Sequence, residues 1–310
     1  MKIAVIGTGG LVGSAVMRRW NSIPLSGKSA CPEPPDELIG FDLPEFDAAS
    51  RISTDGLVSL RPDVILNLAS INLPDRLESH PNTARTIHVQ GAANLRHTAA
   101  KTGALLVQLG CGEIFYRDGD APPHSEDDTP NPESVYAVTK LDAERAVSEY
   151  DRHLIVRTSA LFGEPGTQGT GNFIDTILKT VRRTRTIQVL NDTRVSLTDA
   201  DDLVGALRFL THSGTTGLFH VAPPDTVTPA EAAVFLMNAC GLRNHRIVGI
   251  TLKEYGCIAP RSRSTALDAS RYRALPGAYP IPGWRQALRR FLDRRAQGNA
   301  PLLPTVENKI

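Results

Sequence analysis

The residues that decide the fold are KIAVIGTGGLVGSAV, from Lys2 to Val16. The run 2–6 is short, apolar and rich in β-branched residues, and it stops at glycines, which predicts a buried strand. Apolar residues recur at helical spacing over 11–20, with Arg18 and Arg19 on the opposite side. The stretch therefore predicts a strand, a glycine turn and a helix.

The turn has the pattern G-x-x-G-x-x-G, formed by Gly7, Gly10 and Gly13. Glycines at the first strand-to-helix junction allow a tight turn and a close approach of a pyrophosphate to the backbone. The helix N-terminus then supplies amide donors and the positive end of its dipole. The predicted cofactor-binding residues of the turn are Gly7, Gly10, Leu11, Val12 and Gly13.

The same alternation of strand and helix continues along the chain. Apolar runs at 38–41, 64–68, 105–109 and 154–156 alternate with helical segments, among them 83–102 and 136–150. This order predicts an α/β protein with a Rossmann-like, doubly wound parallel sheet that carries helices on both faces.

After residue 163 the pattern becomes irregular, which predicts a smaller, interleaved C-terminal lobe. We expect the NAD(P)-binding domain at 1–162 together with 191–213. The predicted substrate-binding lobe comprises 163–190 and 214–298, and 299–310 is a tail. Residues 24–37 are rich in helix breakers and are expected to form a surface loop.

Composition excludes several classes of function. The chain of 310 residues has 34 basic and 33 acidic residues and a net charge of +1, so no strong field attracts nucleic acid or an anionic membrane. Four cysteines without CxxC spacing favour a reducing, cytoplasmic location. The sequence has no apolar segment long enough to predict a membrane span. The residues around His124 and His220 do not have the spacing of a metal site.

Asp42 ends the second predicted strand and is placed to bind the adenosine ribose of a dinucleotide. A carboxylate there would accept hydrogen bonds from the ribose hydroxyls and repel a 2′-phosphate. The cofactor is therefore predicted to be NAD(H) or NADP(H), with NAD favoured.

The segment SVYAVTKLDAERAV, 134–147, places Tyr136 and Lys140 four residues apart on a predicted helix, so both side chains leave the same face. An ammonium near a phenol favours the phenolate, and we expect Lys140 to lower the pKa of Tyr136 and to hold the cofactor ribose. The pair predicts a proton donor and its positioning cation, and we expect both Tyr136 and Lys140 to bind the cofactor.

These motifs, with LRPDVILNLAS at 60–70, HLIVRTSALFG at 153–163 and GNF at 171–173, resemble the extended short-chain dehydrogenase/reductases. Within that class the chain is most similar to the dTDP-4-dehydrorhamnose reductase type. The resemblance covers most of the chain. It implies a nicotinamide cofactor and a nucleotide-diphosphate sugar substrate.

The resemblance also implies roles for residues outside the two motifs. Asn67, Ala69 and Ser70 would line the ribose and phosphates of the cofactor. In the second lobe, four residues would contact the nicotinamide or the sugar nucleotide: Arg157, Ser159, Asn172 and Arg261.

The stretch LGCGEIFY, 109–116, departs from the family pattern. Cys111 stands where the family has a serine or threonine whose hydroxyl helps to hold the substrate oxygen beside the tyrosine. A thiol is a weaker donor, so polarisation of a ketone should suffer. His88 stands where the family usually has asparagine.

Glu113 follows two residues later, where related reductases have an aromatic residue and sugar-nucleotide dehydratases have a catalytic glutamate. Three interpretations stay open. Glu113 is a proton shuttle of an epimerase or dehydratase, a ligand of a substrate hydroxyl in a reductase, or a surface acid.

The leading hypothesis is NAD(P)H-dependent reduction of a keto group on a nucleotide-activated deoxysugar, with Tyr136, Lys140, Cys111 and Glu113 as catalytic residues. The first alternative is an NAD-dependent nucleotide-sugar epimerase or dehydratase that uses Glu113 as base. The second is a catalytically weak regulatory or binding subunit of the same fold. A homodimer is left open.

Overall fold

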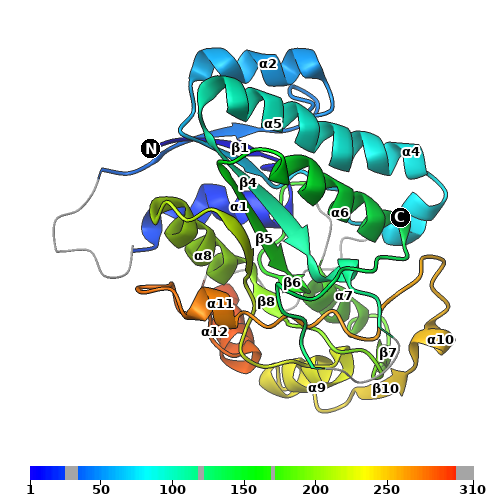
Figure 1. The fold of residues 1–310 in the computed structure, drawn as a ribbon. Coiled ribbons are helices and arrows are strands. Elements are labelled where there is room, and N and C mark those ends of the chain that lie inside the picture. Colours follow the sequence, from blue (N-terminus) through cyan, green and yellow to red (C-terminus); the bar gives the residue numbers. More distant parts are fainter. Residues whose placement is uncertain (25–33, 118–121, 169–171, 298–310) are drawn as a thin grey trace.

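The computed structural model describes residues 1–24, 34–117, 122–168 and 172–297. Its centre is a parallel sheet in the order β2-β1-β3-β4-β5-β9 (Figure 1). The strands are β1 (Lys2–Ile6), β2 (Glu37–Phe41), β3 (Val64–Asn67), β4 (Leu105–Cys111), β5 (His153–Thr158) and β9 (Gly217–His220). The predicted parallel sheet is confirmed, whereas the tail 299–310 and most of the predicted loop 24–37 lie outside the described residues.

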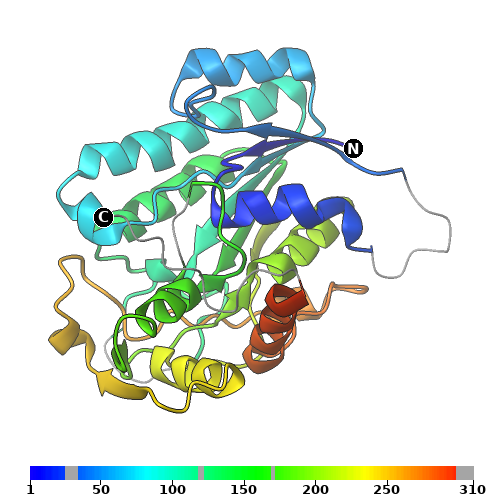
Figure 2. The same ribbon diagram turned by 180° about the vertical axis from the view of Figure 1, so that it is seen from behind.

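Helices cover both faces of the sheet because the strands are apolar on both sides. In β1, Ile3 and Val5 pack into the core beneath α1 (Leu11–Arg19) and α8 (Ala200–His212). Ala4 and Ile6 face the opposite core, beneath α2 (Arg51–Leu60), α5 (Gly91–Thr102) and α6 (Val135–Ser148). Successive side chains of a strand point to opposite faces, so one run of apolar residues serves both cores. Figure 2 shows α1 from the reverse side.

Shorter elements connect these layers. The predicted helix at 83–102 is built from α4 (Pro81–Ala84), a π-helical segment η2 (Arg85–Gln90) and α5. The remaining short helices of this part of the chain are η1 (Trp20–Ser22), α3 (Pro74–Glu78) and η3 (Gly112–Ile114).

The site is positioned by the order of the strands. The chain leaves β1 to form β2 on one side and returns to form β3 on the other, with Ile6 opposite Phe41 and Asn67. Such a reversal opens a crevice at the carboxyl ends of the strands, where ligands bind in doubly wound folds. The glycine turn follows β1 at this point.

The smaller lobe lies at one end of the sheet, at the bottom of Figure 1. Its elements are α7 (Phe173–Thr180), β7 (Thr186–Leu190), α9 (Pro229–Ala239), β10 (Arg246–Ile250), α10 (Leu252–Tyr255) and α12 (Trp284–Gln297). β7 and β10 pair in parallel, and apolar side chains of α7, α9 and α12 share one core. A second short pair, β6 (Leu161–Phe162) and β8 (Thr198–Asp199), precedes α8.

The predicted boundary at residue 214 needs correction. β9 pairs with β5 in the central sheet, with Val156 opposite Phe219. Tyr272, in α11 (Ser270–Arg273), is buried in the core beneath α1 and α8. Later segments of the chain return to the sheet and bury the apolar side chains at its edge. The rest of the predicted division stays a prediction.

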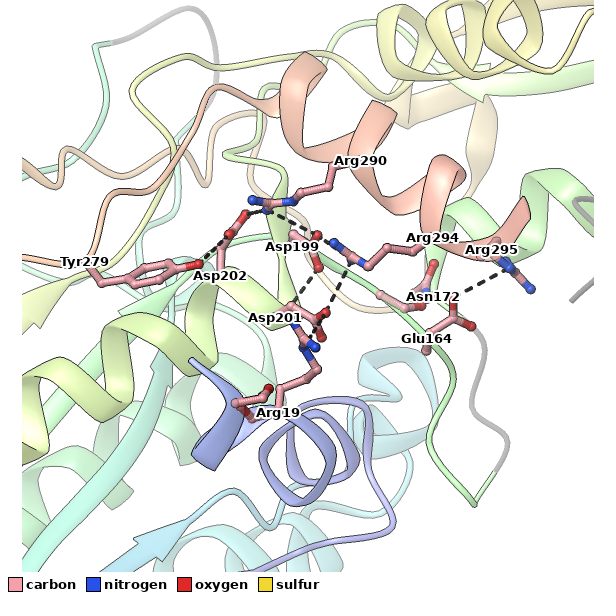
Figure 3. A network of polar contacts seen from close by, with 12 residues as sticks. Arg19, Glu164, Asn172, Asp199, Asp201, Asp202, Tyr279, Arg290, Arg294 and Arg295 are labelled. Carbon is pink, nitrogen blue, oxygen red and sulfur yellow. Dashed lines mark hydrogen bonds and ion pairs between the residues drawn. The ribbon is translucent and has the colours of Figure 1, made fainter. Parts of the chain in front are cut away.

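A network of ion pairs joins α12 to the first turn of α8 (Figure 3). Arg294 donates to Asp199, the N-cap residue of α8, at 2.8 Å, and Arg290 pairs with Asp202. Carboxylates in a first helical turn are favoured by the helix dipole, and the arginines offset their burial. Burial still raises the pKa of Asp202 to about 6. The network fixes α12 against α8, which packs on the central sheet.

Candidate functional site

The glycine turn leaves no space for side chains at two of its positions. Gly7 has a φ of 86°, and a Cβ there would lie 2.8 Å from the backbone nitrogen of Ala69. A Cβ on Gly13 would lie 2.1 Å from the carbonyl oxygen of Gly7. The first turn of α1 therefore packs directly against the end of β1.

The N-terminus of α1 suits an anionic group. Its N-cap is Gly10, no side chain caps the helix, and its first turn has no acidic residue. The first amide groups of a helix lack intrahelical partners and carry the positive end of the dipole. The turn thus fits the pyrophosphate of a dinucleotide, and Leu11 and Val12 lie in the first turn of α1. Their contacts with a cofactor remain predictions.

Asp42 lies against this turn. Its carboxylate accepts hydrogen bonds from the backbone nitrogen of Gly9 and, at 2.9 Å, from that of Leu43. The side chain of Gln168, from the segment that follows β6, donates to the same carboxylate at 3.1 Å. Asp42 therefore reaches the crevice as expected. Gln168 is a neighbour that the sequence reasoning missed, because the segment is 126 residues away in sequence.

The segment after β3 forms the opposite wall. Asn67 is buried, donating to the side chain of Gln108 at 2.8 Å and accepting from the backbone of Ala69 at 3.3 Å. Ser70 contacts His88, with 3.1 Å between Oγ and Nε2. Asn67 therefore holds the turn after β3, Ala69 packs against Gly7, and Ser70 faces the tyrosine. Contacts of these residues with a cofactor remain predictions.

Tyr136 and Lys140 leave the same face of α6 and are both buried, at 7% and 4% exposure. The pKa of Tyr136 is not lowered as expected from the neighbouring Lys140. Burial and the neighbouring Cys111 and Glu113 raise the pKa of Tyr136 well above its usual value. Lys140 instead donates to the backbone carbonyl of Leu109 at 2.7 Å, and burial lowers its pKa. Tyr136 is thus a neutral phenol that holds its proton.

Cys111 ends β4 beside the tyrosine. Its side chain packs against the small apolar cluster that contains Tyr136, and it raises the pKa of that tyrosine. Burial raises the pKa of Cys111 to about 11, so the group is a thiol at neutral pH and no nucleophile. The structure therefore places Cys111 in the position that the resemblance implied.

Glu113 lines a cavity of about 620 Å³, which we call the Glu113 cavity. Arg261 and Thr265 line it on the polar side, and burial raises the pKa of Glu113 while Arg261 lowers it. The apolar wall comes from α7, β7 and α10 and includes Phe173, Ile177, Val189 and Tyr255. Glu113 is half-buried and lines this cavity, which argues against its interpretation as a surface acid. Glu113 also raises the pKa of Tyr136, so this cavity-lining carboxylate lies near the tyrosine.

The other predicted second-lobe residues are engaged within the protein. Arg157 is buried and donates two hydrogen bonds to Glu144, at 2.8 and 3.0 Å. Asn172 caps α7, accepting a hydrogen bond from the backbone nitrogen of Asp175 at 3.1 Å and donating to the carbonyl of Gly163 at 2.9 Å. The geometry gives both residues structural roles, and neither lines the Glu113 cavity.

Ser159 and Arg261, the other two predicted residues of the second lobe, lie next to the Glu113 cavity or in its wall. Ser159 is 3.1 Å from the hydroxyl of Thr265, which lines the Glu113 cavity. Arg261 lines the cavity itself and pairs with Asp75 at 3.1 Å. The apolar wall was missed from the sequence. The spacing of apolar residues in α7 would have shown only that one face of this helix is covered.

Within the ranges that the structure describes, no group of three or more His, Cys, Asp or Glu residues could hold a metal ion. Among the helices of those ranges, none has the length and apolar character needed to cross a membrane.

A doubly wound fold with a dinucleotide turn, a buried tyrosine-lysine pair and an adjoining cavity defines a nicotinamide-dependent oxidoreductase of the extended short-chain dehydrogenase/reductase class. The family model for the RmlD substrate binding domain matches residues 1–297. The chain belongs to this family.

Named relatives agree with this assignment. The chain is 28% identical to dTDP-4-dehydrorhamnose reductase of Escherichia coli K12, over 84% of this chain and 90% of the relative. It is 30% identical to dTDP-4-dehydrorhamnose reductase of Mycobacterium tuberculosis CDC 1551, over 80% of each. The crystal structure of dTDP-4-dehydrorhamnose reductase from Bacillus anthracis in complex with NADP has a TM-score of 0.85 at 24% identity, covering 94% of this chain and 99% of that one. This last likeness establishes the shared fold.

Proposed function

We propose that the protein reduces a keto group on a nucleotide-activated deoxysugar, as the names of its relatives indicate for them. The observation that carries the proposal is the buried pair Tyr136 and Lys140, with Glu113, which lines the cavity, close enough to Tyr136 to raise its pKa. Reduction of a ketone needs one hydride and one proton. The bound nicotinamide supplies the hydride, and the protein must supply the proton and the geometry.

Each residue has a stated part in this reaction. Tyr136 donates its phenolic proton to the substrate oxygen as that oxygen gains charge, and its raised pKa keeps it protonated at neutral pH. Cys111 holds the same oxygen through its thiol, more weakly than a hydroxyl would. Lys140 holds the hydroxyl groups of the cofactor ribose. Arg261 at the cavity wall suits a diphosphate, because its planar fork matches phosphate oxygens.

Asp42 supports NADH as the preferred reductant. Its carboxylate lies against the phosphate turn, where a 2′-phosphate of NADPH would meet a like charge. The Bacillus anthracis relative of the same fold is in complex with NADP, so NADPH is tested beside NADH. The preference is measured directly by comparing kcat/KM for the two reductants.

The decisive experiment incubates the purified protein with dTDP-4-dehydrorhamnose and either NADH or NADPH. We expect loss of absorbance at the reduced nicotinamide band and a product heavier by two hydrogens, in equal amounts. Tyr136→Phe should lose most of the rate while it keeps its fold and its cofactor affinity. Reduction that is unaffected by this substitution would contradict the assignment of Tyr136.

A second candidate function is epimerisation or elimination with Glu113 as base, and the burial of Glu113 in the cavity favours it. A raised pKa suits a group that takes and returns a proton near neutrality. This reaction would turn over with bound NAD and no net use of reductant. The product masses separate the cases, since epimerisation leaves the mass unchanged and elimination removes water.

The remaining assignments belong to the same proposal. A regulatory subunit without efficient catalysis would bind the cofactor and give no product with any sugar tested. The cytoplasmic location rests on the three cysteines of the described ranges, which are all free thiols. A homodimer stays a prediction, which light scattering would test.

A further inference from the structure

His88 is a buried histidine that the proposed reaction does not use. It is 3% exposed and belongs to the π-helical segment η2, a geometry that often accompanies functional sites. Burial and the nearby charge of Lys140 lower its pKa to about 3, so the ring is neutral at physiological pH. Both ring nitrogens have polar partners.

Those partners define the tautomer of the ring. The backbone nitrogen of Ile71 can only donate, and it lies 3.3 Å from Nε2 of His88. Nε2 is therefore the acceptor, and Nδ1 carries the proton, which it donates to the Thr139 hydroxyl at 2.9 Å. The Ser70 hydroxyl, 3.1 Å from Nε2, consequently acts as a donor to the ring.

Ser70 connects this ring to the tyrosine. The Ser70 side chain also lies near Tyr136, and it lowers the pKa of the phenol. The rings of His88 and Tyr136 meet edge to face, with centroids 5.7 Å apart and an interplanar angle of 82°. A serine hydroxyl has one proton, so Ser70 donates either to His88 or to Tyr136.

The chain of contacts that runs from Tyr136 through Ser70 and His88 ends at Thr139. The Thr139 hydroxyl lies 2.8 Å from the carbonyl oxygen of Val135 and 3.0 Å from that of Tyr136, both in the same helix. Carbonyl oxygens can only accept, so no proton enters from that side. The contacts can orient a hydroxyl group, but they cannot resupply Tyr136 with a proton after turnover.

We propose that His88 is a positioning residue that acts on Tyr136 through Ser70, by giving the Ser70 hydroxyl a second acceptor. While Tyr136 keeps its proton, the Ser70 hydroxyl points to Nε2 of His88. When Tyr136 has given its proton to the substrate, the Ser70 hydroxyl turns to the phenolate. The link to catalysis rests on the proposed function, whereas the exchange of partners concerns this chain alone.

Opposite effects on Tyr136 follow from this exchange. Without Ser70 the phenolate loses a donor, so Ser70→Ala should raise the pKa of Tyr136. Without His88 the Ser70 hydroxyl has no competing acceptor and always faces the phenol, so His88→Ala should lower it. Each shift should be about one pH unit, as for one hydrogen bond to a charged group. In the double variant His88 has nothing to act through, and the value should equal that of Ser70→Ala.

Other titratable groups around the tyrosine stay constant in this comparison. They are Cys111 and Glu113 from the end of β4, and Lys140 on the helix of Tyr136. None is altered in the variants, so their influence is shared by all of them.

The test replaces the six tyrosines of the chain by difluorotyrosine, whose phenol titrates at lower pH, and follows fluorine resonances against pH. Tyr136→Phe identifies the resonance of residue 136. This readout needs neither substrate nor turnover. A high-pH limb of kcat/KM, which reports loss of the Tyr136 proton, should move in the same directions.

Two conservative variants separate positioning from packing. His88→Gln keeps an acceptor at the distance of Nε2 and should titrate like wild type. His88→Asn keeps a donor for Thr139 but does not reach Ser70, so Tyr136 should titrate in it as in His88→Ala. This variant replaces His88→Ala in the comparison if His88→Ala folds poorly. Equal values for Gln and Asn, or an unchanged effect of His88→Ala in the absence of Ser70, would overturn the proposal. If the titrations behave as expected and no sugar is reduced, only the proposed function fails.

Discussion

Replacement of Arg157 by methionine tests whether this arginine is structural or binds substrate. In the structure its guanidinium donates to Glu144 at 2.8 and 3.0 Å, and the two side chains are only 6% and 4% exposed. The pair connects β5 to α6, the helix that carries Tyr136. Methionine fills most of the space of the arginine stem but leaves the Glu144 carboxylate without its cation.

The expected loss of stability is large. Removing one partner of a buried ion pair costs about 3–5 kcal/mol, because an uncompensated charge stays in the interior. A loss of this size is a large part of the total stability of a typical protein, about 5–15 kcal/mol. The matched control is Arg145→Met on the same helix, where Arg145 is 68% exposed and pairs with Asp142 at 3.1 Å. Exposed pairs contribute about 0–1 kcal/mol, so this variant should unfold like wild type.

The loss of stability in Arg157→Met should depend on pH, because it depends on the charge of Glu144. Burial already raises the pKa of Glu144, and loss of Arg157 should raise it further. A group with a raised folded-state pKa contributes its stability below the unfolded pKa, and that contribution disappears as pH rises through the folded value. The deficit of Arg157→Met should therefore be small near pH 4.5 and grow toward neutral pH, with the unfolded pKa near 4.3.

Urea unfolding of wild type, Arg157→Met and Arg145→Met at several pH values measures these differences. For the folded fraction we expect KM for the sugar nucleotide to stay within about twofold of wild type, since loss of a substrate contact would raise it. The reasoning is refuted if Arg157→Met unfolds like the control. A deficit that does not change with pH would refute the role of the Glu144 charge.

Three further substitutions test the site. Cys111→Ser supplies a stronger donor and should raise kcat by roughly three- to tenfold, as one improved hydrogen bond allows; an unchanged or lower kcat would show that the thiol does not hold the substrate oxygen. Gly13→Ala places a methyl group 2.1 Å from the Gly7 carbonyl oxygen. Titration calorimetry should show cofactor binding that is weaker by at least tenfold. The overpacking should also cost about 1–3 kcal/mol of stability. Gly10→Ala meets no atom closer than 3.6 Å and serves as the control for folding, so equal destabilisation of the two would contradict the steric argument. Asp42→Ser removes the charge that would repel a 2′-phosphate, and kcat/KM for NADPH relative to NADH should rise; an unchanged ratio would place the preference elsewhere.

The fold was predictable from the sequence because its signals are local. A strand, a glycine turn and a helix are fixed by residues within about fifteen positions, and repetition of this unit predicts a parallel sheet. The structure confirms the sheet and places Gly7 and Gly13 in contacts that admit no side chain. The boundary at 214 was wrong because β9 joins the sheet through pairing with β5, which is a long-range contact.

The sequence by itself determined the cofactor turn, the tyrosine-lysine spacing and the unusual Cys111, since each depends only on residue type and on helix or strand geometry. Tertiary structure alone decided what these groups do. Burial from several elements keeps Tyr136 protonated, and the carbonyl of Leu109 occupies Lys140. Desolvation and partners distant in sequence set these properties, and a linear pattern of residues contains neither.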